Sequence, residues 1–172
     1  MKTLLLMRHA KSSWKDHDLE DIDRPLTKRG RHDAPEMGSL LKKEKLVPQL
    51  ILSSNARRAF KTAGWVAEAL KLEEETIQIH ESLYLAETED LIKEINLVPN
   101  NVDTVLIIGH NPGLEALAQL FTEKVISMPT ASIAYLKLPV DQWADVTNET
   151  EAELKELFRP AKKDKKDKKD KK

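Results

Sequence analysis

Short apolar runs alternate along this chain with longer stretches in which apolar residues recur every three or four positions. The short runs are rich in leucine and β-branched residues and favour strands, whereas the longer periodicity favours helices. The runs predict strands at Thr3–Met7, Gln49–Leu52, Thr76–Ile79, Val102–Ile108 and Ser132–Leu138. The stretches between them predict helices from Thr27 to Lys43, from Ala56 to Leu70, after Thr88 and from about Leu114.

A proline interrupts the first helical pattern. Thr27 is suited to cap the N-terminus of this helix, and Ala34, Met37 and Leu40 form an apolar face. Pro35 lies inside the pattern and lacks the N–H that an interior helical residue donates. The sequence therefore predicts either a kinked helix or a helix in two pieces.

The alternation of strands with helices predicts the fold class. Such an order is typical of a three-layer α/β/α sandwich with a mostly parallel central sheet. The near-continuous apolar run VLIIG, residues 105–109, indicates a strand covered on both faces. The segment ASIAYLKLP, residues 131–139, alternates and ends in proline, so we expect an antiparallel strand at one edge.

Length and composition fit one domain. The chain has 172 residues, of which 40% are hydrophobic and 33% charged, so it can bury a sizeable core. We assign the domain to residues 1–160. The last twelve residues, AKKDKKDKKDKK, hold eight lysines and three aspartates, and we expect residues 161–172 to be disordered. This tail carries +5 of a total charge of −1, which leaves −6 on residues 1–160.

Composition also disfavours several classes of function. An acidic body argues against a nucleic-acid-binding face. No run approaches the eighteen apolar residues of a membrane span, so we expect no membrane partner and a cytoplasmic location. The chain has no cysteine, which excludes a disulfide framework, a thiolate nucleophile and a cysteine-type zinc site.

Polar side chains follow three of the predicted strands. Arg8 and His9 lie near the end of LLLMRHA, residues 4–10. The segment SSNARR covers residues 53–58, and GHNPG contains His110 and Asn111. Ligands of open α/β sheets bind at the carboxyl ends of the strands, so we expect these segments to meet on one side. Two arginines and two histidines gathered there would bind an anion, and the planar guanidinium suits phosphate oxygens.

Each of these segments also has a structural explanation. A lone histidine at a strand end is more often a hydrogen-bonded structural residue, and GHNPG could be only a turn into a helix. Arg57 and Arg58 oppose the dipole of the helix they open, so a structural origin suits them less. Metal binding by His9 and His110 is the competing chemistry, but no metal-site spacing is present and the guanidiniums would repel a dication. We therefore predict no metal and no cofactor.

Four motifs resemble, in order and spacing, one known family. The segments LLLMRHAKSSW, DRPLTKRG, SSNARRAFKTA and IIGHNPG are similar to those of the histidine phosphatase superfamily, and most similar to its small SixA-like phosphohistidine phosphatase branch. The match spans about Lys2 to Leu138. It implies a phosphoglycerate mutase-like fold and a reaction through a phosphorylated histidine.

The resemblance also implies roles for individual residues. His9 matches the nucleophile and Arg8 its neighbouring arginine. RAFKT fits the pattern R-A-x-x-T and places the second arginine at Arg58 rather than Arg57, and GHNP places the second histidine at His110. We expect further substrate contacts from Arg24, Ser12, Ser53 and Asn111, with an ion pair to Asp21 or Asp23 as the alternative for Arg24.

One position departs from the pattern of the superfamily. Many members carry a glutamate, the general acid, shortly after the third strand, and Leu85 occupies the aligned position here. Glu81 and Glu87 are nearby, but neither fits the alignment. The missing acid resembles the SixA-like branch and bears on the substrate.

The sequence therefore predicts a metal-independent phosphatase that acts on phosphohistidine in a protein partner. Neutral His9 is expected to attack phosphorus, with its other N–H held by a backbone carbonyl. Arg8, Arg58 and His110 are expected to hold the phosphoryl oxygens. Two alternatives remain open: a phosphatase acting on small phosphate monoesters, and a module that binds phosphate without turnover.

Overall fold

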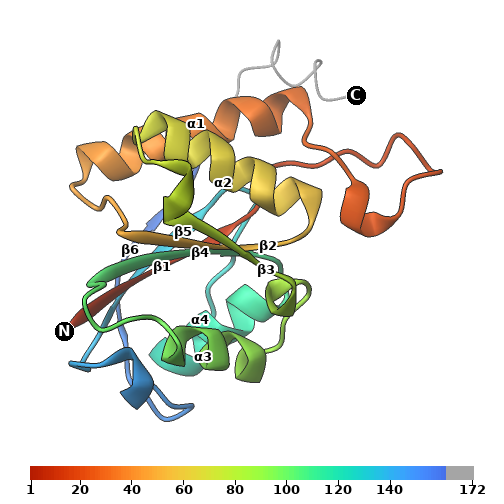
Figure 1. Ribbon diagram of the computed structural model, residues 1–172. Coiled ribbons are helices and arrows are strands. Elements are labelled where there is room, and N and C mark those ends of the chain that lie inside the picture. The colour runs from red at the N-terminus through yellow and green to blue at the C-terminus, as the bar shows by residue number, and fades with distance from the viewer. Residues whose placement is uncertain (162–172) are drawn as a thin grey trace.

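The computed structural model describes residues 1–161 and contains a six-stranded sheet between two layers of helices (Figure 1). The strands are β1 (Lys2–Arg8), β2 (Leu50–Ser54), β3 (Ile77–His80), β4 (Thr104–Gly109), β5 (Ile133–Leu138) and β6 (Glu153–Phe158). The helices are α1 (Lys28–Lys43), α2 (Arg57–Ala69), α3 (Thr88–Asn96) and α4 (Gly113–Thr122). The predicted α/β/α sandwich is thus confirmed, and every predicted strand and helix is present.

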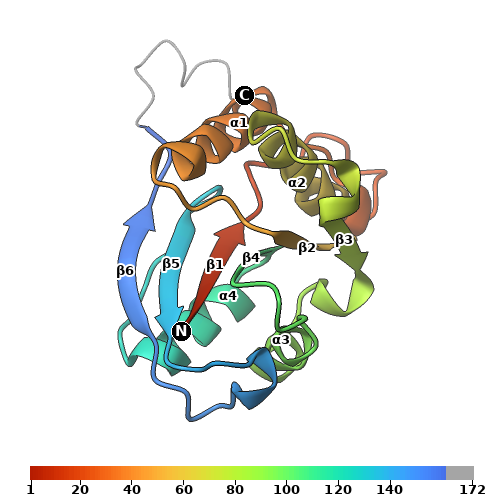
Figure 2. The ribbon, with the colours of Figure 1, turned by 60° about the vertical axis from the view of Figure 1, so that its left-hand side comes forward.

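The sheet is mostly parallel and has the strand order β3-β2-β4-β1-β5-β6 (Figure 2). Strands β3, β2, β4 and β1 run parallel, and β5 is antiparallel to β1. The predicted antiparallel strand is therefore confirmed, but its place at the edge was wrong. β6 pairs with β5 and takes the edge. Its sequence, ELKELF, is half charged and has no buried residue, so it lacks the apolar run that marks most of the other strands.

Alternating side chains of the central strands separate two cores. In β1, Leu4 and Leu6 face the core beneath α3 and α4, whereas Leu5 and Met7 face the core beneath α1 and α2. All four side chains are fully buried. This period of two is what a strand between two helical layers requires, and it explains why β1 is apolar at every position from Leu4 to Met7.

Helix α1 is continuous through Pro35, which rules out the alternative of a helix in two pieces. Thr27 caps its N-terminus as predicted, and the Thr27 hydroxyl accepts the Gly30 N–H at 3.1 Å. A Cβ on Gly30 would lie 2.3 Å from the carbonyl oxygen of Lys11. The glycine of DRPLTKRG therefore allows the first turn of α1 to touch the segment that follows His9.

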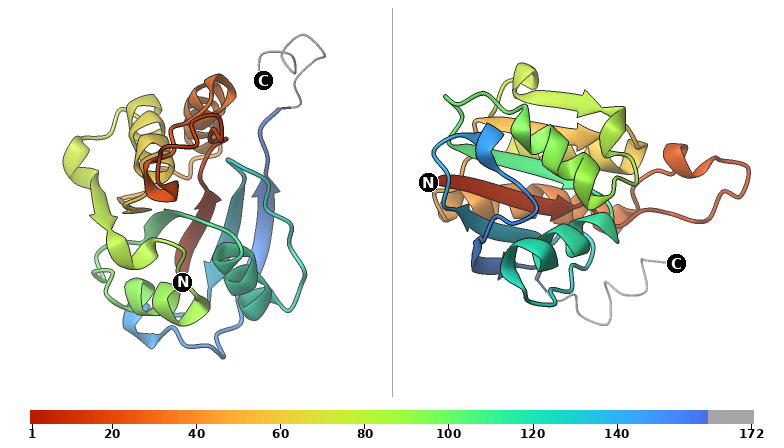
Figure 3. Two further views of the ribbon diagram at one scale, coloured as in Figure 1. Left: turned by 90° about the vertical axis from the view of Figure 1, so that its right-hand side faces the viewer. Right: turned by 90° about the horizontal axis from the view of Figure 1, so that it is seen from below.

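A long loop, residues 11–26, projects beyond the sheet on the side toward which β1 points (Figure 3). It includes a short 3₁₀ turn at Asp21–Asp23. In the part of the chain that the structure describes, no helix has the length and apolar character needed to cross a membrane. The predicted disorder of the Lys/Asp tail concerns residues that, apart from Ala161, lie outside the described ones.

Candidate active site

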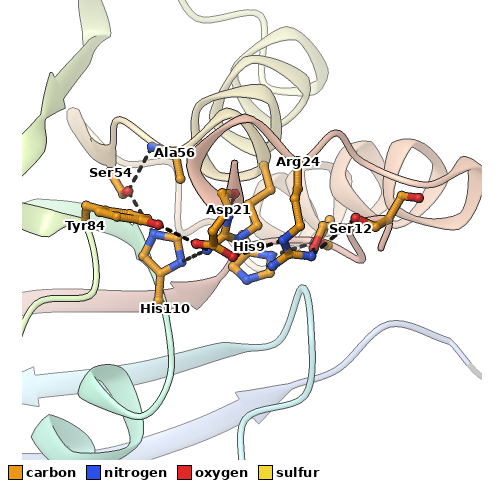
Figure 4. Close-up of polar contacts among 11 residues, drawn as sticks. His9, Ser12, Asp21, Arg24, Ser54, Ala56, Tyr84 and His110 are labelled. Carbon is orange, nitrogen blue, oxygen red and sulfur yellow. Dashed lines mark hydrogen bonds and ion pairs between the residues drawn. The ribbon is translucent and has the colours of Figure 1, made fainter. Parts of the chain in front are cut away.

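The three polar segments meet at the carboxyl ends of β1, β2 and β4, as predicted. The rings of His9 and His110 lie with their centroids 5.3 Å apart. Nη2 of Arg58 lies 3.4 Å from Nδ1 of His110. Arg8 precedes His9 at the end of β1, and its positive charge is close enough to both histidines to lower their pKa values. We call Arg8, His9, Arg58 and His110 the strand-end cluster, of which His9 and His110 are labelled in Figure 4.

Backbone contacts hold His9 rigidly. Its N–H donates to the carbonyl of Gly109 at the end of β4 at 3.1 Å, and its carbonyl accepts the N–H of Ala131 at 3.0 Å. The ring nitrogen Nδ1 lies 2.7 Å from the carbonyl oxygen of Ala10. Because a carbonyl only accepts, Nδ1 carries the proton, and Nε2 is left with its lone pair. The predicted hydrogen bond that fixes the tautomer is therefore present.

His9 is neutral at physiological pH. Burial of the ring lowers its pKa, the hydrogen bond to Ala10 raises it, and the electrostatic interactions with His110, Arg58 and Arg8 lower it further. The result is a pKa of about 3 instead of 6.5. A side chain only 6% exposed thus keeps a free ring nitrogen.

The motif RAFKT explains how Arg58 is placed. Arg58 lies in the first turn of α2 and is 2% exposed, whereas Arg57 beside it is exposed. One turn later, the Thr62 hydroxyl accepts the Ala10 N–H at 3.0 Å and donates to the Arg58 carbonyl at 2.6 Å. Thr62 therefore fastens the backbone after His9 to the helix that carries Arg58.

His110 is also neutral and has a partner on each nitrogen. A guanidinium only donates, so Nδ1 accepts from Arg58 and Nε2 donates to the Ser54 hydroxyl at 2.8 Å. Ser54 Oγ also accepts the N–H of Ala56 at the start of α2. Burial and the neighbouring Arg58 lower the pKa of His110 to about 4.

Asp21 bridges two arginines and a tyrosine at the rim of the cluster. Its carboxylate accepts from Arg58 Nη2 and from Arg24 Nε, each at 3.0 Å, and from the Tyr84 hydroxyl. Burial alone would raise the pKa of Asp21, but the hydrogen bonds from Tyr84, Arg58 and Arg24 outweigh it and lower the pKa to about 2. Burial and Asp21 raise the pKa of Tyr84. Asp21 is therefore ionised and Tyr84 protonated at neutral pH.

Arg24 lies on the side of His9 opposite Tyr84 in the close-up (Figure 4). Its Nη1 donates to Ser12 Oγ at 2.8 Å, and its guanidinium stacks 3.5 Å from the centroid of the Trp14 ring. The ion pair with Asp21, the alternative considered for Arg24, is present. Arg24 is nevertheless only 7% exposed, so the arginine of this pair is buried in the site rather than on the surface.

The other predicted contacts are placed differently. Ser53 is fully buried and its hydroxyl donates to the Ser54 carbonyl, so Ser54 is the serine that reaches His110. Asn111 donates to the carbonyl of Met128 at 2.9 Å, and Arg8 donates to the same oxygen at 3.2 Å. Buried Nε atoms of Arg8 and Arg58 and the buried Oδ1 of Asn111 have no protein partner.

Among the described residues, neither Glu81 nor Glu87, the carboxylates of the segment expected to carry a general acid, hydrogen-bonds or ion-pairs with the cluster. Leu85 is 54% exposed and adopts a left-handed backbone with φ of 50°. Glu87 forms a capping box with Asp90 at the start of α3, and Glu81 is exposed. The neighbour Tyr84 turns inward instead, with its ring 5.5 Å from that of His110.

Sequence reasoning missed Ser54, Tyr84 and Thr62, and it considered Asp21 only as a partner of Arg24. Thr62 had a signal, because it is the final residue of the motif that located Arg58. Tyr84 and Asp21 had none beyond their nearness to other motifs, since the two lie 63 positions apart in the chain.

The net charge of the cluster favours an anion. Arg8 and Arg58 belong to the cluster and Arg24 lies beside it, whereas the carboxylate of Asp21 contacts two of these arginines, Arg58 and Arg24. Among the described residues, the group with spacing suited to a metal is His32, Asp33 and Glu36 on α1. Asp33 accepts from Arg29 at 3.1 Å, and neither His9 nor His110 belongs to this group.

Comparison with known proteins agrees with this arrangement. The family model described as Histidine phosphatase superfamily (branch 1) matches residues 4–89. An uncharacterised protein of Mycobacterium tuberculosis strain H37Rv is 34% identical over 151 residues, which cover 81% of this chain and 91% of that protein. The chain therefore belongs to branch 1 of the histidine phosphatase superfamily.

Solved structures share the fold. A protein assigned as the phosphohistidine phosphatase SixA of Nakamurella multipartitia has a TM-score of 0.81 and 24% identity, covering 94% of this chain and 97% of that one. One assigned as SixA of Agrobacterium tumefaciens has a TM-score of 0.75 and 26% identity, covering 92% and 99%. The predicted phosphoglycerate mutase-like fold and the resemblance to the superfamily are thus confirmed.

Proposed function

We propose that this protein hydrolyses phosphohistidine on a protein partner, through a phosphohistidine formed on its own His9. The observation that carries the proposal is the state of the carboxylate nearest the cluster. Asp21 has a pKa of about 2 and accepts hydrogen bonds from two arginines and Tyr84, so it has no proton to give. A phosphatase without an acid is suited to a leaving group that needs none.

The first step would transfer the phosphoryl group to His9. The Nε2 lone pair forms the new P–N bond, while the substrate P–N bond breaks and its electron pair returns to the substrate imidazole. That imidazole, protonated on its other nitrogen, leaves as a neutral ring. Arg8 and Arg58 hold the phosphoryl oxygens through nitrogens that have no protein partner, such as the buried Nε atoms.

The second step would release inorganic phosphate. Water attacks phosphorus, the His9 P–N bond breaks with its electrons returning to Nε2, and the proton of water passes to phosphate or solvent. The dianionic phosphoryl group favours the protonated form of His110, whose Nδ1 then donates a hydrogen bond to a phosphoryl oxygen and keeps its proton, so His110 does not act as an acid. The fixed Nδ1–H of His9, held by Ala10, keeps Nε2 aimed at phosphorus in both steps.

Small phosphate monoesters are the second candidate. Expulsion of an alkoxide needs a proton, and a positioned acid supplies about 10²–10⁴-fold for that step. Glu81 and Glu87 are the nearby carboxylates, but one is exposed and the other caps α3. The relative assigned as SixA from Agrobacterium tumefaciens, at 26% identity, also supports the phosphohistidine substrate.

A substrate panel tests the proposal. Phosphoramidate, a phosphohistidine protein, phosphoserine and a sugar phosphate are assayed at equal concentration with wild type, Glu81→Gln and Glu87→Gln. We expect the two P–N substrates to have the higher kcat/KM and both variants to match wild type. An alkyl phosphate as the best substrate, or a glutamine variant that selectively loses ester hydrolysis, would overturn it.

A further inference from the structure

A cleft lies next to the candidate active site, on the Ser12 side of Arg24. It has a volume of about 680 Å³, within the usual range for ligand sites. Residues 11–15 form one wall, and residues 25–28 with Arg31 form the other. The cleft borders the candidate active site at Ser12, which lines the cleft and accepts the hydrogen bond from Arg24.

The cleft is cationic. Lys11 and Lys15 from one wall and Lys28 and Arg31 from the other line it, and all four are exposed. None of the described residues that line it is acidic. The acidic residues of the intervening loop, residues 16–23, lie outside the lining, and Asp21 among them is turned to Arg58 and Arg24.

Backbone hydrogen bonds join the two walls. The Ser13 N–H donates to the Pro25 carbonyl and the Thr27 N–H to the Lys11 carbonyl, each at 2.9 Å. Arg31 donates to the Leu26 carbonyl at 2.9 Å, which fixes one of the cations. Trp14, 67% exposed, stacks on the Arg24 guanidinium and presents an aromatic surface at this end of the site. The charges therefore surround a preformed groove.

We infer that this cleft, lined by Lys11, Lys15, Lys28 and Arg31, binds an acidic segment next to the phosphohistidine of the protein substrate. The inference rests on the proposed function and names the partner's chemistry. The rest of the body is acidic, since residues 1–160 carry −6, so a carboxylate-rich segment is attracted only where cations gather. The same net charge disfavours a nucleic acid, whose long phosphate backbone would meet the acidic surface beyond the cleft.

Two synthetic peptides of equal length test this inference. Each has one central phosphohistidine, and its flanking residues are aspartate and glutamate in one peptide and serine and glutamine in the other. The proteins are wild type, the double variant Lys15→Glu/Lys28→Glu, and a control double variant Lys61→Glu/Lys124→Glu. The control replaces two exposed lysines away from the cleft and changes the net charge equally.

We expect wild type and the control to prefer the acidic peptide in kcat/KM, and the cleft variant to lose that preference by about tenfold, mainly through KM. Phosphoramidate turnover should stay equal in all three proteins.

Equal cleavage of both peptides by wild type, or equal losses in the two double variants, would overturn the inference. So would inhibition by an oligonucleotide but not by polyglutamate, which would favour nucleic acid. Failure of wild type to cleave either peptide or phosphoramidate would instead overturn the proposed function.

Discussion

The strand-end cluster and the bridge between Asp21 and Tyr84 both surround the same space, but different parts of the structure hold them. His9 and His110 follow buried parallel strands directly, so the sheet places them with little freedom. Asp21 and Tyr84 come from two loops and depend on each other and on Arg58 for their positions. The comparison distinguishes the histidines, which we expect to contact the phosphoryl group, from Asp21 and Tyr84, which set the charge around Arg58 at the rim of the site.

The largest effect is expected for the central histidine. His9→Ala should abolish turnover, because no other described side chain offers a fixed, unprotonated ring nitrogen at this place. Wild type should accumulate acid-labile phosphate during turnover, and the variant should not. Radiolabelling with phosphoramidate measures this, and His17→Ala, an exposed histidine, is the control. Retained activity in His9→Ala would remove the nucleophile assignment.

The next effect concerns the protonation of His9. Because the pKa of His9 is about 3 in the folded protein and near 6.5 in the unfolded chain, the ring between these pH values is neutral when folded and protonated when unfolded. The stability from the neutral ring is therefore complete above pH 6.5 and falls as pH drops toward 3. NMR of the His9 ring, identified with His9→Ala, should show no titration between pH 8 and pH 5. A titration midpoint near pH 6.5 would mean that solvent reaches the His9 ring, which contradicts its burial in the structure.

Arg57 and Arg58 are neighbours in the sequence, but only Arg58 belongs to the cluster. Arg58→Ala should lower kcat by about 10²-fold or more, the scale for removing one donor to a developing charge, and His110→Ala should do the same. Arg57→Ala should cost far less, because Arg57 is exposed while Arg58 is buried. Steady-state kinetics with phosphoramidate gives all three values. The reverse ranking of the two arginines would contradict the placement of α2.

At the rim, Asp21→Asn should strengthen phosphate binding rather than abolish it. The carboxylate competes with phosphate for Arg58 and Arg24, and a neutral amide of the same shape competes less. We expect the inhibition constant of inorganic phosphate to fall about tenfold, the scale of one charge-assisted hydrogen bond. Asp23→Asn, on the same 3₁₀ turn but exposed, is the control. Weaker phosphate binding in Asp21→Asn would show that Asp21 positions Arg58 instead.

The smallest effect is expected for the Lys/Asp tail. Truncation after Pro160 should leave kcat and the melting temperature unchanged, because the tail offers no large apolar side chain to a core. Thermal unfolding and phosphoramidate turnover of the truncated protein measure both. A loss of several degrees in melting temperature would mean that the tail binds to the domain.

The same comparison explains what could be predicted from sequence. His9 and His110 follow apolar runs that sequence alone identifies as buried parallel strands, and the rule for strand ends brings them together. Asp21 and Tyr84 lie 63 positions apart, in two loops without hydrophobic periodicity. No local sequence pattern therefore predicts their contact. β6 was missed because an edge strand that has no buried residue can be as charged as a loop.

The central claim is that catalysis proceeds without an acid from the protein, and the dependence of rate on leaving group tests it most directly. A series of aryl and alkyl phosphates with increasing leaving-group pKa is compared with phosphoramidate in kcat/KM. The account predicts a steep fall along the esters, with activated aryl phosphates well ahead of alkyl ones and the P–N substrate ahead of alkyl esters. A shallow dependence, with alkyl phosphates cleaved as well as aryl ones, would contradict it, because only a proton donor in the site could produce that result.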